Sequence, residues 1–173
     1  RFGGEYQKPV DITSVNSFKN TLDENYSSIY AEGDIYITPK LVARAGLRGE
    51  NSEVLRKMNI APRFSLAYKT GKYSQFSFAS GKFYQVPQEK FILTYPGVSF
   101  NYESATHFIL NFQHISDYRT FRIEAYYKEY DNLTRYVNNT ADNSGYGHAK
   151  GIDFFYRDKK TISKADFWIS YSL

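Results

Sequence analysis

The residue types that most often carry catalysis or bind metals are few in this chain, and their spacing suits neither role. His107 and His114 are seven positions apart, so on one strand their side chains would point to opposite faces and could not share a metal ion. His148 stands alone beside Gly147. The chain has no cysteine, which excludes a disulfide framework, a thiolate zinc site and a cysteine nucleophile.

Paired carboxylates are the remaining catalytic candidate. Glu32 and Asp34 would share one face of a strand, and glycosidases use two such groups. The polar faces of the predicted strands carry basic as well as acidic residues. Glu32 and Asp34 are therefore better explained as solvated or ion-paired side chains than as a catalytic pair. No Gly-x-Ser-x-Gly, His-Glu-x-x-His or P-loop motif is present in the sequence. We therefore predict that the chain is not an enzyme and needs no cofactor or metal.

The composition limits the class of protein further. Of the 173 residues, 18% are aromatic, which is unlike a disordered chain. No apolar run approaches the roughly 18 residues that a membrane-spanning helix needs. The net charge of +4 comes from basic and acidic residues mixed along the chain, so no nucleic-acid partner is expected.

The elements that must position these residues show a period of two, which is typical of strands. In residues 121–128, Phe121 and Ile123 alternate with Arg122 and Glu124. We predict an all-β fold, an antiparallel up-and-down meander of about nine strands that forms part of a transmembrane β-barrel. The predicted strands are 1–8, 26–37, 41–49, 58–68, 74–86, 102–115, 120–131, 147–157 and 164–173.

The connections between these strands alternate between long and short. They are 9–25, 38–40, 50–57, 69–73, 87–101, 116–119, 132–146 and 158–163. In a meander, alternate connections lie at opposite ends of the sheet, so one end would carry only tight turns and the other all the long loops. Short turns at one end and long loops at the other are the arrangement of bacterial outer-membrane barrels. Pro62 cannot donate to a ladder, so regular pairing of its strand is expected to start near Arg63.

The two faces of the strands predict two surroundings. The apolar face would meet lipid, and the polar face would line a wet lumen where both signs of charge pair across strands. The predicted lumen-facing residues, which we call the polar set, are Glu32, Asp34, Arg44, Arg48, Arg63, Glu103, Arg122, Glu124, Lys128, Asp153 and Arg157. Loop residues that are polar or aromatic are candidates for substrate contact. They are Tyr95, Asn101, Asn138, Asn139, Asp142, Asn143 and Tyr146.

Several segments, in their order and spacing, resemble the barrel of a TonB-dependent outer-membrane receptor. They are residues 30–32 (YAE), 38–41 (TPKL), 46–48 (GLR), 62–63 (PR), 81–87 (GKFYQVP), 103–107 (ESATH), 122–128 (RIEAYYK) and 147–153 (GHAKGID). The resemblance implies energy-driven import of a scarce, bulky nutrient across the bacterial outer membrane. It also implies four partners: outer-membrane lipid, the remainder of the barrel, a plug domain, and the energy-coupling TonB protein acting through that plug.

The length indicates how much of such a receptor these residues represent. A barrel of this type has about 22 strands around a plugged lumen, which 173 residues cannot supply. We therefore expect residues 1–173 to be a single segment from the middle of a barrel, without the plug. Its sheet should be open, with residues 1–8 and 166–173 not bonded to each other. The alternatives are a complete small barrel with a structural or adhesion role, and a soluble all-β carbohydrate-binding module.

Overall fold

A computed structural model describes residues 1–8, 10–15, 18–23 and 25–173. In this part of the chain, nine strands form one antiparallel sheet in the order β1-β4-β5-β6-β7-β8-β9-β10-β11, and β2 and β3 form a separate hairpin. The strands are β1 (Phe2–Gln7), β2 (Val10–Val15), β3 (Phe18–Asp23), β4 (Tyr26–Thr38), β5 (Leu41–Ser52), β6 (Lys57–Lys69), β7 (Ser74–Gln85), β8 (Glu103–Ile115), β9 (Arg119–Val137), β10 (Thr140–Asp158) and β11 (Phe167–Ser172). The predicted fold class, an up-and-down meander, is confirmed.

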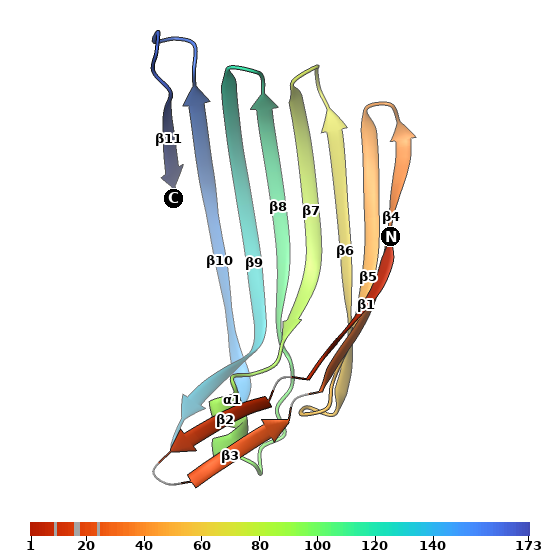
Figure 1. The fold of residues 1–173 in the computed structure, drawn as a ribbon, viewed down its shortest axis with the longest axis vertical. Coiled ribbons are helices and arrows are strands. Elements are labelled where there is room, and N and C mark those ends of the chain that lie inside the picture. The colour runs from red at the N-terminus through yellow and green to blue at the C-terminus, as the bar shows by residue number, and fades with distance from the viewer. Residues whose placement is uncertain (9, 16–17, 24) are drawn as a thin grey trace.

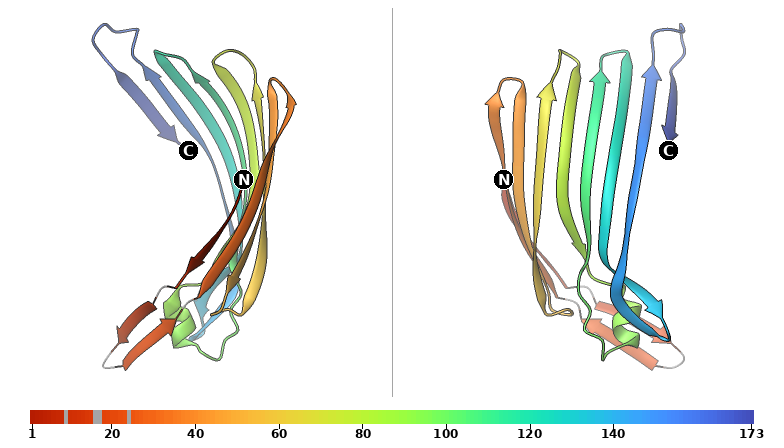
Figure 2. Two further views of the ribbon diagram at one scale, coloured as in Figure 1. Left: turned by 45° about the vertical axis from the view of Figure 1, so that its right-hand side comes forward. Right: turned by 180° about the vertical axis from the view of Figure 1, so that it is seen from behind.

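The sheet is a curved, open wall whose edges are β1 and β11 (Figures 1 and 2). One end, which we call the turn end, carries the connections 39–40, 70–73, 116–118 and 159–166. The opposite end, the loop end, carries the β2–β3 hairpin and the short helix α1 (Glu89–Thr94), which lie together beyond the strands (Figure 1). Among the described residues, no helix has the length and apolar character needed to cross a membrane.

Two predicted loops are wrong in detail. The segment 9–25 contains the β2–β3 hairpin. The segment 132–146 is mostly strand, because β9 and β10 continue to a two-residue turn at Asn138 and Asn139. Both asparagines have positive φ, 52° and 64°, as a tight hairpin turn requires. The polar composition of this segment concealed the strands, because it lacks the apolar alternation from which the other strands are predicted. The expected strict alternation of long and short connections is therefore wrong, although the two longest connections do share the loop end.

Pro62 lies inside β6 and not at its start. The β5–β6 ladder includes Leu47 opposite Pro62, so the prediction that this strand pairs only from Arg63 is wrong. On its other side, however, β6 pairs with β7 only from Arg63 to Lys69. The proline therefore sits where one ladder ends, and its missing N–H interrupts no bond to β7.

Apolar side chains gather in two different places. Across the strands, one register row joins Ala43, Leu66, Phe78, Leu110, Ala125 and Ile152 without a polar residue. The large residues of this face are exposed or half-buried, with Leu110 54% and Ile123 39% accessible and Leu66 and Phe78 half-buried. At the loop end, by contrast, a small core is formed by Leu55, Phe100, Tyr102 and Ala141.

Candidate functional site

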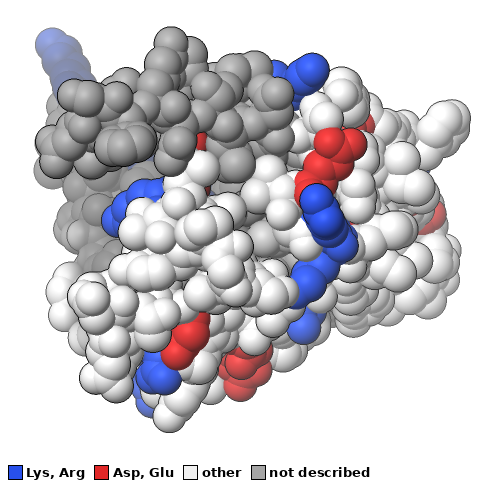
Figure 3. All heavy atoms as spheres, turned by 90° about the horizontal axis from the view of Figure 1, so that it is seen from below, with Lys and Arg blue, Asp and Glu red and all other residues white. Residues whose placement is uncertain are grey.

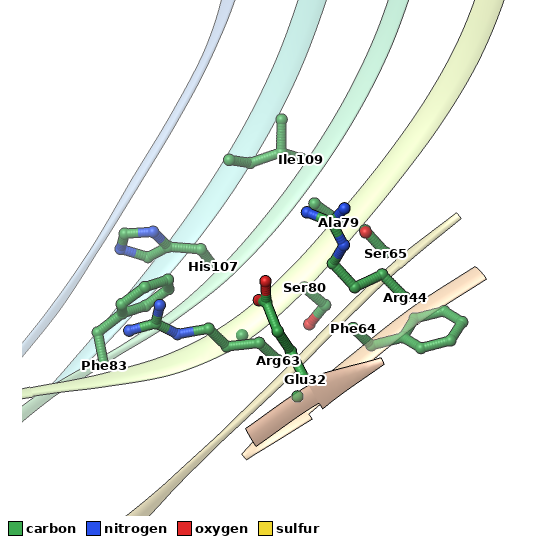
Figure 4. Close-up of a pocket in the computed structure, with 12 residues that line it drawn as sticks. Glu32, Arg44, Arg63, Phe64, Ser65, Ala79, Ser80, Phe83, His107 and Ile109 are labelled. Carbon is green, nitrogen blue, oxygen red and sulfur yellow. The ribbon is translucent and has the colours of Figure 1, made fainter. Parts of the chain in front are cut away.

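The strand register brings the whole polar set to one face of the sheet, opposite the apolar row. On β9, for example, Arg122 and Glu124 pair with Gln113 and Asn111 of β8, while Ile123 between them pairs with Phe112. Phe64 and Arg63 of β6 likewise point in opposite directions (Figure 4). Because paired residues of antiparallel strands share a face, residues that are far apart in the sequence line one continuous polar surface.

Several members of this surface are paired by charge. Arg44 holds Asp34 of the neighbouring strand through two hydrogen bonds, 2.5 Å from Nε to Oδ1 and 3.0 Å from Nη2 to Oδ2. Arg48 joins Glu50 at 2.7 Å and Glu5 at 3.1 Å. Such planar, two-point contacts fix the side chains as well as neutralise them.

Three basic residues of the polar set have no carboxylate partner within the described residues. Arg122 lies over the ring of Phe155, and Lys128 over that of Tyr126. Arg63 lies over Phe83, with its guanidinium carbon 4.8 Å from the ring centroid. The polar surface is therefore not neutralised evenly.

Arg63 is the first layer of a stack. The ring of Phe83 is in turn 4.7 Å from the ring of His107, at an interplanar angle of 35° (Figure 4). Arg63, His107 and Lys128 belong to one register row, which runs Glu32, Gly46, Arg63, Gly81, His107, Lys128 and Ala149. The alternation in the sequence assigns Arg63 to the polar face, but it does not reveal Phe83 and His107 as its neighbours, because the three residues lie on three different strands.

A hollow of about 220 Å³ opens at this stack (Figure 4). Glu32 and Arg44 line one side of it, and Phe83 and His107 the other. Ala79 and Ile109 add apolar surface. The hollow thus combines an unpaired guanidinium with mainly apolar walls, the pattern of a site that orients a ligand by few polar contacts.

The loop end brings some of the predicted contact residues together. The amide of Asn101 donates to Asn143 Oδ1 at 2.8 Å, and the side-chain amide of Asn143 donates to the Asn132 carbonyl at 2.8 Å. Tyr95, just after α1, lies 6.2 Å from the ring of Tyr136 on β9. Asn101, Asn143 and Tyr95 are therefore engaged in holding the β9–β10 hairpin against the connection that contains α1.

The other predicted contact residues lie along the β9–β10 hairpin. Asn138 and Asn139 form its turn, and Tyr146 is 85% exposed. Asp142 accepts hydrogen bonds from the Ser144 hydroxyl at 2.6 Å and amide at 2.9 Å, and pairs with Arg135 at 3.1 Å. These contacts lower the pKa of the Asp142 carboxyl to about 2. Tyr102 lies in the small core, where burial raises its pKa to about 12.

Viewed from the loop end, the side chains that the structure describes are mostly uncharged, with basic and acidic residues scattered singly or in small mixed groups (Figure 3). Among the described residues, no three His, Asp or Glu side chains come together as a metal site. His107 and His114 lie on opposite faces of the sheet. In the register with β9, His107 pairs with Lys128 and His114 with Phe121. His114 instead shares a 2.8 Å hydrogen bond with Ser74.

Comparison with known proteins gives solved structures only, since no family model and no curated protein matches the chain. The siderophore receptor PirA from Pseudomonas aeruginosa superposes with a TM-score of 0.79 at 16% identity, over 99% of this chain and 36% of that one. The FrpB iron transporter from Neisseria meningitidis superposes with a TM-score of 0.71 at 15% identity, over 88% of this chain and 25% of that one. The siderophore receptor PirA from Acinetobacter baumannii superposes with a TM-score of 0.68 at 12% identity, over 82% of this chain and 26% of that one.

The chain has the fold of a section of such a receptor's β-barrel. Its nine-stranded meander corresponds to a quarter to about a third of the length of these structures. The resemblance to a TonB-dependent receptor barrel that the sequence segments indicate is therefore confirmed at the level of fold.

Proposed function

We propose that this chain is part of the barrel wall of an outer-membrane receptor that imports a scarce nutrient. The observation that carries the proposal is the apolar row on one face of the strands, which no described element covers, with the polar set on the other face. A sheet that exposes leucine, isoleucine and phenylalanine in unbroken rows fits contact with lipid, and its polar face fits a wet lumen.

The neighbours favour iron, or an iron-binding siderophore, as the imported substrate. Their names describe an iron transporter and two siderophore receptors. TonB dependence, a plug domain inside the barrel and location in the outer membrane form part of the same proposal. The role is that of a transporter and not of an enzyme, which agrees with the absence of catalytic motifs in the sequence. The loop-end residues Tyr95 and Tyr146 are our candidates for substrate contact.

Site-directed spin labelling tests the two faces, and the absence of native cysteine makes each label unique. The Ile123→Cys and Glu124→Cys variants are labelled separately after the chain is folded into lipid vesicles. We expect the label at position 123 to be relaxed by oxygen, which concentrates in lipid, and the label at 124 by a water-soluble nickel chelate. Equal access of both positions to the nickel chelate would refute the proposed wall.

A binding assay tests the substrate separately. Ferric complexes of catecholate, hydroxamate and carboxylate siderophores are titrated into the folded chain in neutral detergent. We expect at least one to bind and the Tyr95→Ala/Tyr146→Ala double variant to bind it more weakly, with Tyr118→Ala at the turn end as the matched control. If no ferric complex binds, or if the loop-end and control variants are affected equally, these residues do not contact the substrate.

A further inference from the structure

We propose that Arg63, positioned by Phe83 and His107, forms a binding site for a carboxylate on the polar face of the sheet. The ligand is a carboxylate carried on a small apolar or aromatic group. This site goes beyond the proposed function. Binding of a carboxylate to Arg63 does not depend on transport and can be measured on the folded chain alone.

The first argument is the contrast between two arginines that line the same hollow. Arg44 is saturated by its two-point contact with Asp34. Arg63 has no carboxylate within ion-pair distance among the described residues, although its side chain is held over Phe83. A guanidinium presents a planar fork of donors that matches both oxygens of a carboxylate. Arg63 can therefore offer a ligand the same two-point contact that Arg44 makes with Asp34.

The stack supplies the second argument, because it fixes the guanidinium in advance. Phe83 supports Arg63 from one side and is itself backed by His107 at 4.7 Å. An arginine whose orientation is set by a ring loses less side-chain freedom when a ligand binds. Phe83 and His107 are thus positioning residues, and Arg63 makes the contact.

Glycine on both neighbouring strands keeps the site open. In the register, Arg63 lies between Gly46 of β5 and Gly81 of β7. A Cβ added at Gly81 would lie 3.2 Å from Arg63 Cγ and 3.3 Å from the Phe83 ring. Any larger residue would therefore push against both members of the stack. The remaining walls, Ala79 and Ile109, suit an apolar group attached to the carboxylate.

Charge around the hollow is positive on balance. Among the described residues, Glu32 is the only acidic one that lines it, and its carboxylate lies 3.7 Å from Arg1. Lys128 follows in the same register row and has no carboxylate partner within the described residues. Removal of the Glu32 charge should therefore strengthen binding of an anion.

The same carboxylate could come from a free small molecule or from an acidic side chain of a polypeptide that lies against this face. Benzoate and its neutral counterpart benzamide represent the first source. A short capped peptide with one glutamate, and the same peptide with glutamine, represent the second. Each is titrated into the folded chain in neutral maltoside micelles, and the Arg63 Nε and His107 ring signals are followed by NMR.

We expect saturable shifts of both signals with benzoate, with the glutamate peptide, or with both, and none with the neutral counterparts. Binding of benzoate assigns the site to free carboxylates, and binding of the peptide alone assigns it to a polypeptide segment. Absence of saturable shifts with either carboxylate, or equal shifts with the neutral compounds, would overturn the proposal.

Variants separate the site from general charge effects. Arg63→Gln should weaken binding by about tenfold or more, because it removes a charge-assisted two-point contact. Arg122→Gln removes the same charge from the same face outside the hollow and should change affinity by less than about twofold. Glu32→Gln should strengthen binding by roughly two- to fivefold.

Two further variants keep the test valid if Arg63→Gln misfolds. Arg63→Lys retains the charge and should show intermediate affinity, since an ammonium lacks the planar fork. Phe83→Leu keeps an apolar side chain but removes the stacking ring, so it should weaken binding while circular dichroism remains unchanged. Equal affinity in Arg63→Gln, Arg122→Gln and the parent chain would show that Arg63 makes no such contact.

Discussion

Apolar side chains are largely exposed along the strands of this protein but buried at its loop end. Along the strands, Leu110 and Ile123 are exposed on a continuous apolar face. At the loop end, Phe100 is only 4% exposed and packs in a small core with Leu55 and Tyr102. Within the described strands, the buried hydrophobic residues are only three alanines: Ala43, Ala61 and Ala141.

If the strands form part of a barrel wall in the outer membrane, as we propose, the difference follows from two solvents. In lipid, an apolar side chain gains nothing by turning inward, so the strands can be one layer thick with no core behind them. In water, apolar side chains must pack against each other, so the loop end needs a core of the ordinary kind. Under this proposal, apolar side chains are exposed along the strands and buried at the loop end for the same physical reason, since each region matches its own solvent.

The largest expected effect is at the loop-end core. Phe100→Ala should cost about 3–5 kcal/mol of local stability, because it removes a buried ring and leaves a cavity. The measurement is hydrogen exchange of the backbone amides between β7 and β8, in the chain folded in lipid. Amides in the middle of β9 should keep their protection.

Phe108→Ala on the apolar face is the matched control. Phe108 is 39% exposed, and lipid can fill the space that its ring leaves, so no lasting cavity forms. Its cost should be clearly smaller than that of Phe100→Ala. Equal losses for the two variants would contradict the division into a lipid-facing surface and a water-facing core.

A charge placed on the apolar face should have the next largest effect. Ile123→Arg should block insertion into the membrane, or cost about 2–4 kcal/mol if the position lies near the bilayer midplane. Glu124→Gln, one residue further on the opposite face, should fold normally. Folding yield into lipid vesicles and urea unfolding of the folded fraction measure both variants. Similar penalties for the two would show that the faces are assigned wrongly.

The sequence predicts the strands well where apolar and polar residues alternate. Phe121, Ile123 and their partners repeat with period two, and the faces read from that pattern agree with the register. Prediction failed where this alternation stops. The ends of β9 and β10 carry polar residues on both faces, and only the ladder and the positive φ angles of Asn138 and Asn139 identify them as a hairpin.

The candidate site could be predicted only in part. Alternation was enough to assign Arg63 to the polar face, and no structure was needed for that. The stack with Phe83 and His107 depends on the register between β6, β7 and β8, which spans connections of different lengths. A shift of one residue in either ladder would have placed His107 on the other face, so the pattern of one strand could not reveal the contact.

Backbone crowding in the β9–β10 hairpin gives a smaller effect. Gly145 lies between two register shifts, and a Cβ there would meet the Leu133 carbonyl oxygen at 2.5 Å. Gly145→Ala should therefore destabilise the hairpin by about 1–3 kcal/mol. Gly147→Ala, two residues on, meets nothing within 4 Å and should be tolerated. Amide protection in residues 132–146 distinguishes the two variants, and equal protection in both would show that the hairpin is not packed as described.

The smallest effect is a pH dependence at the loop end, in the Asp142 carboxylate. Its pKa is lowered to about 2 in the folded chain by the Ser144 hydroxyl and amide and by Arg135, against about 3.9 for an unfolded aspartate. The stabilisation is therefore fully present above the unfolded value and is lost as the pH falls through that value toward the folded one. Asp142→Asn should lower the protection factors of the hairpin amides at pH 7. That difference from the parent chain should shrink between about pH 4 and pH 2, while the protection of the lipid-facing strands stays unchanged. A difference that persists undiminished at pH 2 would show that the carboxylate charge does not stabilise the hairpin.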